Sequence, residues 1–221
     1  MSALTTRMLV LGVVKLFGPA NGYQLRRELL SWQVERWAAL NPGSIYSMLT
    51  TLEKQKAITR HELAARGDDR AATVYTVTEA GDAEFHRLII SALETVPDSG
   101  DVLPLRVAAN FASLLSREEF LTAVRARRGL LQEGIPEFSG VIAELKSSTS
   151  VPPSVAIELQ LEEGLAKAQL EWLEELIALV EGGGLYFRGE DEKVSWAPAA
   201  DDPGWRMFHE REGYRVRIAG S

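Results

Sequence analysis

Residues 41–54 read NPGSIYSMLTTLEK, and this stretch decides the fold of the first half of the chain. Asn41 is a favoured N-cap residue, and Pro42 suits the first helical position, where a missing N–H costs nothing. An apolar side follows the 3.6-residue period at Ile45, Met48, Leu49 and Leu52. These features predict a helix that buries its apolar side.

The opposite side of this helix is small and rich in hydroxyl groups. A solvated helix normally carries Glu and Lys there, whereas short hydroxyl side chains let a helix approach a phosphate backbone closely and hydrogen-bond to it. The residues predicted to contact DNA from this helix and its cap are Asn41, Gly43, Ser44, Tyr46, Ser47, Thr50 and Lys54.

The flanking segments predict the rest of a DNA-binding head. Apolar periodicity predicts helices at residues 4–16 and 22–30. Residues 57–63 and 73–77 are strand-like, and a polar turn with Gly67 separates them. Three helices followed by a hairpin is the order of a winged helix-turn-helix.

Further DNA contacts are predicted around the recognition helix. Tyr23, Gln24 and Arg27 belong to the second helix, where Gln24 and Arg27 would lie outward and position the domain on phosphates. Arg66 and Arg70 at the wing tip would reach the minor groove or the backbone. Packing in the core is the alternative role for Tyr46 and for Tyr23.

Residues 4–95 resemble the DNA-binding domain of the PadR family of bacterial transcriptional regulators. The resemblance rests on Gly22-Tyr23, Pro42-Gly43-Ser44-Ile45-Tyr46, Leu49, Leu52-Glu53 and Tyr75-Thr76-Val77-Thr78-Glu79-Ala80-Gly81. Ala57 departs from the pattern, because the family usually has glycine before the first wing strand. The resemblance implies a homodimeric repressor whose C-terminal helices form the dimer. It also implies a small-molecule inducer, which in the family is often a phenolic acid or a drug-like aromatic.

Composition limits the class of protein. The chain has 221 residues and no cysteine, which fits a reducing cytosol and excludes disulfides and thiolate metal sites. No apolar run approaches the roughly 18 residues of a membrane span, and the N-terminus lacks a signal-peptide pattern. We therefore expect a cytoplasmic protein with no membrane partner.

The net charge of −7 is unevenly distributed along the chain. Residues 1–95 carry 11 Lys and Arg against 10 Asp and Glu, whereas residues 96–221 carry 13 against 21. Within residues 15–70 the balance is 9 against 6. The positive charge lies where a DNA-binding head needs it, but it is mild, so we expect weak non-specific DNA binding.

Residues 96–183 are predicted to form a helical dimerisation domain. Residues 105–115 are periodic, Ser116 begins a capping box, and Pro136 is expected to interrupt the helix that follows. A long helix at residues 154–181 carries an apolar stripe that is predicted to pair with a second copy, with an intrachain helix pair as the alternative. The stripe comprises Leu159, Leu165, Ala166, Leu170, Leu173, Leu176, Ile177 and Val180.

The expected organisation is a head at residues 1–95, the dimerisation domain at 96–183 and a tail at 184–221. The tail holds aromatic residues without a sustained period, so it is expected to dock in part, and no role is assigned to it. Aromatic residues at the junction of the two halves could line a ligand pocket, with core packing as the alternative. They are Trp32, Trp37, Phe111 and Trp172.

The sequence offers no residues for catalysis. His61, His86 and His209 show no metal-ligand spacing, and there is no phosphate loop, nucleophile elbow or dinucleotide fingerprint. We therefore expect no enzyme activity and no cofactor.

The predicted fold is mainly α with a small β-hairpin, an N-terminal winged helix-turn-helix and a C-terminal helical dimerisation domain. The predicted function is a sequence-specific transcriptional regulator, a repressor that binds an inverted repeat in double-stranded DNA as a homodimer and is released by a small ligand. A winged-helix protein-interaction module and a ligand-sequestering protein without an operator are the alternatives.

Overall fold

The computed structural model describes residues 3–65, 70–97, 100–190 and 203–220, with side chains from residue 209 onward in the last range. The chain forms two compact units. The first consists of Met1–Ile89 and Asp191–Ser221, and the second of Ile90–Glu190. The division falls inside helix α5 (Glu79–Glu94).

Four helices begin the first unit, in the order α1 (Ala3–Phe17), α2 (Gly22–Ser31), α3 (Val34–Trp37) and α4 (Pro42–Lys54). The helices predicted at residues 4–16, 22–30 and 41–54 are confirmed to within two residues at each end. The single turn α3 was not predicted, because four residues are too few to show a helical period.

The core of the first unit forms around α1, which packs against α2, α4 and the sheet. Its residues from Met8 to Val14 are all buried, which explains why its apolar residues surround the helix instead of forming one stripe. The other helices contribute one side each, through Leu25, Leu29, Ile45, Leu49, Leu52, Phe85 and Ile89.

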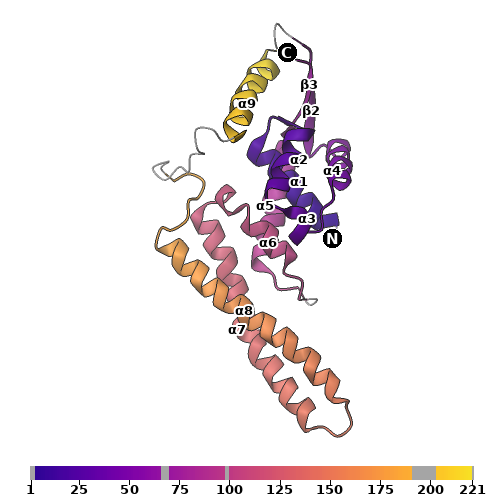
Figure 1. Cartoon of the computed structure of the whole chain (residues 1–221). Helices are drawn as coiled ribbons and strands as arrows, with labels where there is room; N and C mark the ends of the chain where they lie inside the picture. The colour runs from indigo at the N-terminus through magenta and orange to yellow at the C-terminus, as the bar shows by residue number, and fades with distance from the viewer. Residues whose placement is uncertain (1–2, 66–69, 98–99, 191–202, 221) are drawn as a thin grey trace. The chain divides into compact units, whose positions relative to one another are not determined.

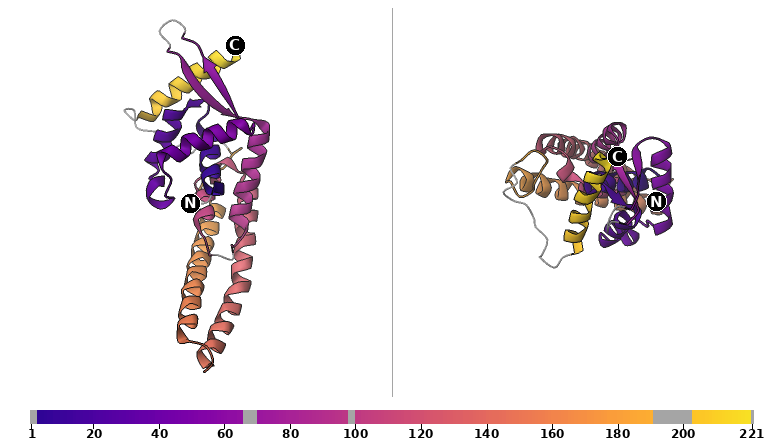
Figure 2. Two further views of the ribbon diagram at one scale, coloured as in Figure 1. Left: turned by 90° about the vertical axis from the view of Figure 1, so that its right-hand side faces the viewer. Right: turned by 90° about the horizontal axis from the view of Figure 1, so that it is seen from above.

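The sheet has three antiparallel strands in the order β1 (Ala20–Asn21), β3 (Ala72–Val77), β2 (Ile58–Leu63). The predicted hairpin is confirmed as β2 and β3, with Ile58 opposite Val77 and Leu63 opposite Ala72. Figure 2 shows these two strands as a narrow ribbon that projects beyond the N-terminal helices. Strand β1 is only two residues long, so it carries no alternation that a sequence could reveal.

The start of α5 is locked to the turn that follows α4. The Thr78 hydroxyl accepts a hydrogen bond from the Gly81 N–H at 3.0 Å and donates to the Lys56 carbonyl oxygen at 2.8 Å. A Cβ at Gly81 would overlap the carbonyl oxygen of Ala57. Lys56 adopts the left-handed conformation with φ 59°, so the turn is made one residue before Ala57. The Thr78–Gly81 signature is therefore a packing requirement.

An ion pair also joins α1 to α5. The Arg7 guanidinium donates from Nε and Nη2 to the two carboxylate oxygens of Glu84, at 2.7 and 2.6 Å. Hydrogen bonding from Arg7 holds the pKa of the Glu84 carboxyl below its usual value. Lys15 of α1 also pairs with Asp82 of α5, so two charged contacts hold α5 against α1.

The second unit is helical. Its helices are α6 (Leu103–Ala109), the 3₁₀ turn η1 (Ala112–Leu114), α7 (Arg117–Ser147) and α8 (Pro153–Glu181). In Figure 1, α7 and α8 run side by side as two long helices. Among the helices in the described ranges, none combines the length and the apolarity needed to cross a membrane.

A capping box sets the start of helix α7, and packing on α8 keeps the helix continuous. The predicted capping box is confirmed, since Ser116 Oγ accepts from the Glu119 N–H and the Glu119 carboxylate accepts from the Ser116 N–H. The expected interruption at Pro136 is wrong, because α7 runs through it to Ser147. Pro136 is exposed, so water can solvate the carbonyl that loses its partner, while packing on α8 keeps the helix continuous.

The predicted dimerisation stripe mostly faces α7 within the same chain. Ala166, Leu173, Ile177 and Val180 are buried in this one chain. Leu159, Leu170 and Leu176 are partly buried, and Leu165 is 43% exposed. A second, exposed stripe lies on α8, which we call the outer α8 stripe. It comprises Ile157, Leu161, Leu165, Trp172 and Leu179.

The tail predicted at residues 184–221 is divided between the two units. Phe187 is fully buried, its ring 5.2 Å from that of Phe120, and Arg117 lies over it at 5.0 Å. Arg117 also pairs with Glu190 at 2.6 Å, so this part of the tail is docked on the second unit. Farther on, helix α9 (Pro203–Ala219) belongs to the first unit, although no period had indicated a helix there.

The Gly81 junction gives a stability prediction. Gly81→Ala would force the α5 start away from Ala57, and such overpacking costs about 1–3 kcal/mol in the free energy of unfolding. Gly43→Ala is the matched control in the same unit, because a Cβ there meets its nearest atom at an ordinary 3.5 Å. Denaturant unfolding of both variants tests this, and equal midpoints would contradict the packing argument.

Candidate nucleic-acid interface

Helix α4 is capped as its sequence predicts. The Asn41 Oδ1 accepts hydrogen bonds from the Ser44 N–H and from the Ser44 hydroxyl, both at 3.0 Å. Pro42 occupies the first turn. Asn41 and Ser44 therefore fix the start of the helix, and the Ser44 proton is already used within the cap.

Helix α4 has one buried apolar side and one exposed side, as its sequence predicts. Ile45, Leu49 and Leu52 are buried, and Met48 is partly buried. The outward side presents Gly43, Tyr46, Ser47, Thr50 and Lys54, all exposed.

Two hydroxyl groups on α4 are turned toward the helix's own backbone. Thr50 donates to the Tyr46 carbonyl oxygen at 3.1 Å, and Thr51 donates to that of Ser47 at 2.9 Å. Such a hydroxyl still offers lone pairs, which can accept from the amino groups of cytosine or adenine. A contact with a phosphate oxygen would require the proton to rotate outward.

Tyr46 combines the two roles that the sequence left open. Its side chain is 44% exposed, while its ring packs on the backbone of α2 at Gly22. A Cβ at Gly22 would lie 2.9 Å from Tyr46 Cε1, closer than real side chains come. Glycine is needed at position 22 because the Tyr46 ring occupies that space, and the rest of the ring stays open to solvent.

The N-terminus of α2 is held by a capping box of its own. Asn21 Oδ1 accepts from the Gln24 N–H at 2.9 Å, and Gln24 Oε1 accepts from the Asn21 N–H at 2.8 Å. Tyr23 is 62% exposed and Arg27 is half-buried, which leaves both able to meet a ligand. The predicted outward position of Gln24 is wrong, because its side chain closes the cap and is buried.

The wing is the hairpin of β2 and β3, and the structure describes it except for residues 66–69. Arg66 lies outside the described residues. Arg70 is exposed and lies two residues before the start of β3. His61 Nε2 lies 2.9 Å from Thr76 Oγ1, so His61 joins the two wing strands. Burial raises the pKa of the Tyr75 phenol on β3.

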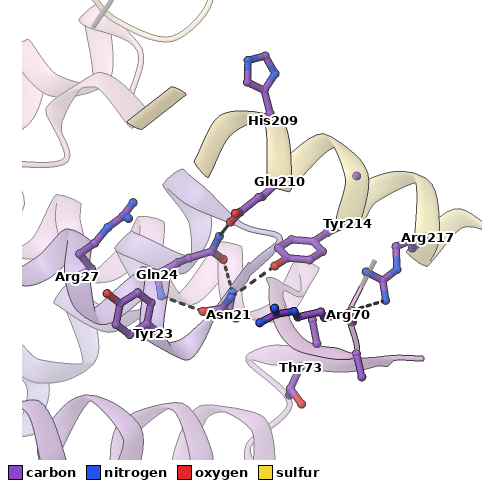
Figure 3. Close-up of a pocket in the computed structure, with 13 residues that line it drawn as sticks. Asn21, Tyr23, Gln24, Arg27, Arg70, Thr73, His209, Glu210, Tyr214 and Arg217 are labelled. Carbon is purple, nitrogen blue, oxygen red and sulfur yellow. Dashed lines mark hydrogen bonds between the residues drawn. The ribbon is translucent and has the colours of Figure 1, made fainter. Parts of the chain in front are cut away.

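Helix α9 lies beside α2 and the wing, and the three enclose a concavity of about 1090 Å³. Figure 3 shows that its walls include four predicted DNA-contact residues, Tyr23, Gln24, Arg27 and Arg70. The opposite wall carries His209, Glu210, Tyr214 and Arg217 of α9. Sequence reasoning missed these residues, because the side of α9 that faces the head is polar and produces no apolar period.

The four predicted ligand-contact residues are divided between the two units. Trp32 and Trp37 belong to the first unit, where the Trp37 indole donates to the Trp32 carbonyl oxygen at 2.8 Å. Phe111 is fully buried core of the second unit. Trp172 is 38% exposed and lines an apolar hollow of about 460 Å³ with Leu105, Ala109 and Leu165.

The first unit therefore has the architecture of a winged helix-turn-helix domain in which one side of α4 is exposed. Residues 10–87 match the model of the Transcriptional regulator PadR-like family.

Solved structures show weaker similarity. Bacillus subtilis PadR, in a crystal structure with operator DNA, is 22% identical and aligns with a TM-score of 0.35, covering 79% of this chain and 98% of its own. The protein smu.1604c of Streptococcus mutans UA159 is 21% identical with a TM-score of 0.34, covering 80% of this chain and 99% of its own. No curated protein matches the chain significantly.

The position of Tyr46 gives a binding prediction. Tyr46→Ala should cost about 1–3 kcal/mol per half-site in binding to the preferred duplex. The melting temperature should stay close to that of the wild type, since the ring lies at the edge of the core. Fluorescence anisotropy and thermal melting test the two parts, with Tyr46→Phe as the control that keeps the ring on Gly22. A large stability loss with unchanged binding would assign Tyr46 to the core.

Proposed function

We propose that the protein is a sequence-specific regulator of transcription that binds double-stranded DNA as a homodimer and acts as a repressor. The observation that carries the proposal is the outward side of α4 in a PadR-like winged helix. Its exposed residues are short or hydroxyl-bearing, with one phenol and a cation near the end. Such a side can enter the major groove closely and hydrogen-bond to base edges and phosphates.

The outer α8 stripe supports the homodimer. Its five large apolar side chains recur at helical spacing on one side of α8 and are between 38% and 66% exposed. The other apolar side of α8 is already buried against α7. A second copy of the same helix is the simplest cover for the remaining stripe, because a two-fold axis makes one stripe complementary to itself.

A two-fold dimer sets the form of the operator. Two recognition helices related by that axis would read successive major grooves roughly 34 Å apart. The operator should then be an inverted repeat. Bound there, the dimer would block the transcription machinery, which is the basis of the repressor assignment.

Release by a small ligand is the last part of the proposal. A ligand that binds better to a dimer with wrongly spaced heads would lower operator affinity by its differential affinity for that state. The apolar hollow beside Trp172 lies along the outer α8 stripe. A flat aromatic molecule bound there would act where the dimer contact is proposed to form.

The test of DNA recognition uses the full chain and the region upstream of its own gene. A gel shift with excess random duplex should show a discrete complex, and selection from randomised duplexes should enrich an inverted repeat. No complex with any duplex would overturn the proposal in favour of a protein-interaction module. Tight binding of an aromatic ligand without DNA binding would favour a ligand-sequestering protein.

The dimer has a separate test. Leu161 is 62% exposed in the middle of the outer α8 stripe, and Leu161→Glu should shift the full chain from dimer to monomer in light scattering. The reason is that an unpaired carboxylate is costly to bury in an apolar contact. Gln160→Glu is the matched control, because it adds the same charge on an exposed neighbour outside the stripe. A monomeric wild type, or a dimeric Leu161→Glu variant, would refute this interface.

A further inference from the structure

Helix α9 carries a positive charge that the rest of the C-terminal half lacks. Residues 203–219 contain four arginines and two glutamates, in a chain of net charge −7. Glu210, Tyr214 and Arg217 recur at spacings of four and three, so they lie on one side of the helix. Figure 3 shows these three side chains directed toward α2 and the wing.

The contacts of α9 with the head are polar. Gln24 Nε2 donates to Glu210 Oε2 at 2.5 Å, and Asn21 Nδ2 lies 3.5 Å from the Tyr214 hydroxyl. Arg217 Nη2 donates to the Ala64 carbonyl oxygen at 2.6 Å and approaches that of Arg70 at 3.3 Å. The helix therefore meets the same α2 N-terminus and wing that are proposed to contact DNA.

The described side chains of helix α9 add little to the hydrophobic core. From residue 209 to 220, where its side chains are described, no residue is fully buried, and Val216 is 72% exposed. Burial of apolar surface is the usual reason for a helix to pack on a domain. Over residues 209–220 the helix is instead held by the polar contacts of Glu210, Tyr214 and Arg217.

The concavity between α9 and the head suits an anionic chain. Of the residues that the structure describes, its walls hold three arginines, Arg27, Arg70 and Arg217, against one carboxylate, Glu210, which already accepts from Gln24. The phenols of Tyr23 and Tyr214 are further hydrogen-bonding groups. At about 1090 Å³ the concavity is large for a small-molecule pocket, and its lining is mainly polar. A run of backbone phosphates fits both its charge and its size.

We propose that α9 is a second DNA-binding element, and that the concavity holds backbone phosphates of the same duplex whose major groove α4 reads. This inference rests on the proposed function. Arg217 would act from one wall while Tyr23 and Arg27 act from the other. The mild basic charge of residues 15–70 would thus be supplemented by a helix distant in sequence.

The test compares two arginines of the same helix in the full chain. Arg217→Gln should weaken duplex binding about threefold to tenfold and reduce the slope of log K against log salt by roughly 0.9, as expected for one lost phosphate contact. Arg215→Gln is the control, because Arg215 is exposed, pairs with Glu212 at 2.5 Å and does not line the concavity. Its binding should stay within about twofold of the wild type.

A second variant separates charge from mere docking of the helix. Among the described residues, Glu210 is the only carboxylate lining the concavity, and Glu210→Gln removes it but leaves an amide oxygen that can accept from Gln24. It should strengthen duplex binding about twofold to fivefold, since a like charge near the phosphates is lost. If α9 only supported the fold of the head, Arg217→Gln would weaken binding while Glu210→Gln would leave it unchanged, and the inference would be wrong. Circular dichroism checks that each variant is folded.

Two other results for Arg217→Gln would overturn the inference. Tighter binding by Arg217→Gln would show that α9 competes with DNA for the head, and unchanged binding would show that it stands outside the interface. In both cases a wild type that binds DNA and is weakened by Tyr46→Ala would keep the proposed function intact. A wild type that binds no duplex would overturn the proposed function, and this inference with it.

Discussion

The close packing of the Tyr46 ring on Gly22 is the contact on which the proposed interface depends. It sets the distance between α2 and α4, because no side chain can stand between the ring and the α2 backbone. The Asn21 capping box places the α2 N-terminus beside this contact, and the Asn41 cap places the start of α4. Two helix ends with exposed polar groups are thereby held in one rigid geometry, and DNA-binding specificity requires this kind of preorganisation.

Features that depend on neighbouring residues could be predicted from the sequence, and features that depend on distant partners could not. The α4 cap and stripe, the Ser116 capping box and the wing strands follow from spacings of a few residues. Strand β1 exists only because β3 lies beside it, and α7 passes Pro136 because α8 supports it. The apolar residues of α8 lie on two sides of the helix, and only the structure shows which side α7 covers.

The residues of the candidate site also fall into those that the sequence predicts and those that depend on distant partners. The exposed positions on α4 follow from helical periodicity, so Gly43, Tyr46, Ser47, Thr50 and Lys54 were predictable. Gln24 was predicted to lie outward because its side chain is polar. Its side chain is buried because it closes the capping box of α2. Helix α9 was missed because its inner side is built from Glu210, Tyr214 and Arg217, which form no apolar pattern. Polar docking of one helix on another depends on tertiary geometry.

The acidic total charge of the chain is compatible with DNA binding because electrostatic interactions in salt solution are short-ranged. At physiological ionic strength the Debye length is about 8 Å, so charges farther than this from a phosphate count little. What matters is the local sign along the path of the backbone. Among the described residues around the concavity, three arginines face one carboxylate that is already hydrogen-bonded. In the proposed complex the net charge of −7 would therefore oppose binding little, and α4 and the arginines would act where the duplex lies against them.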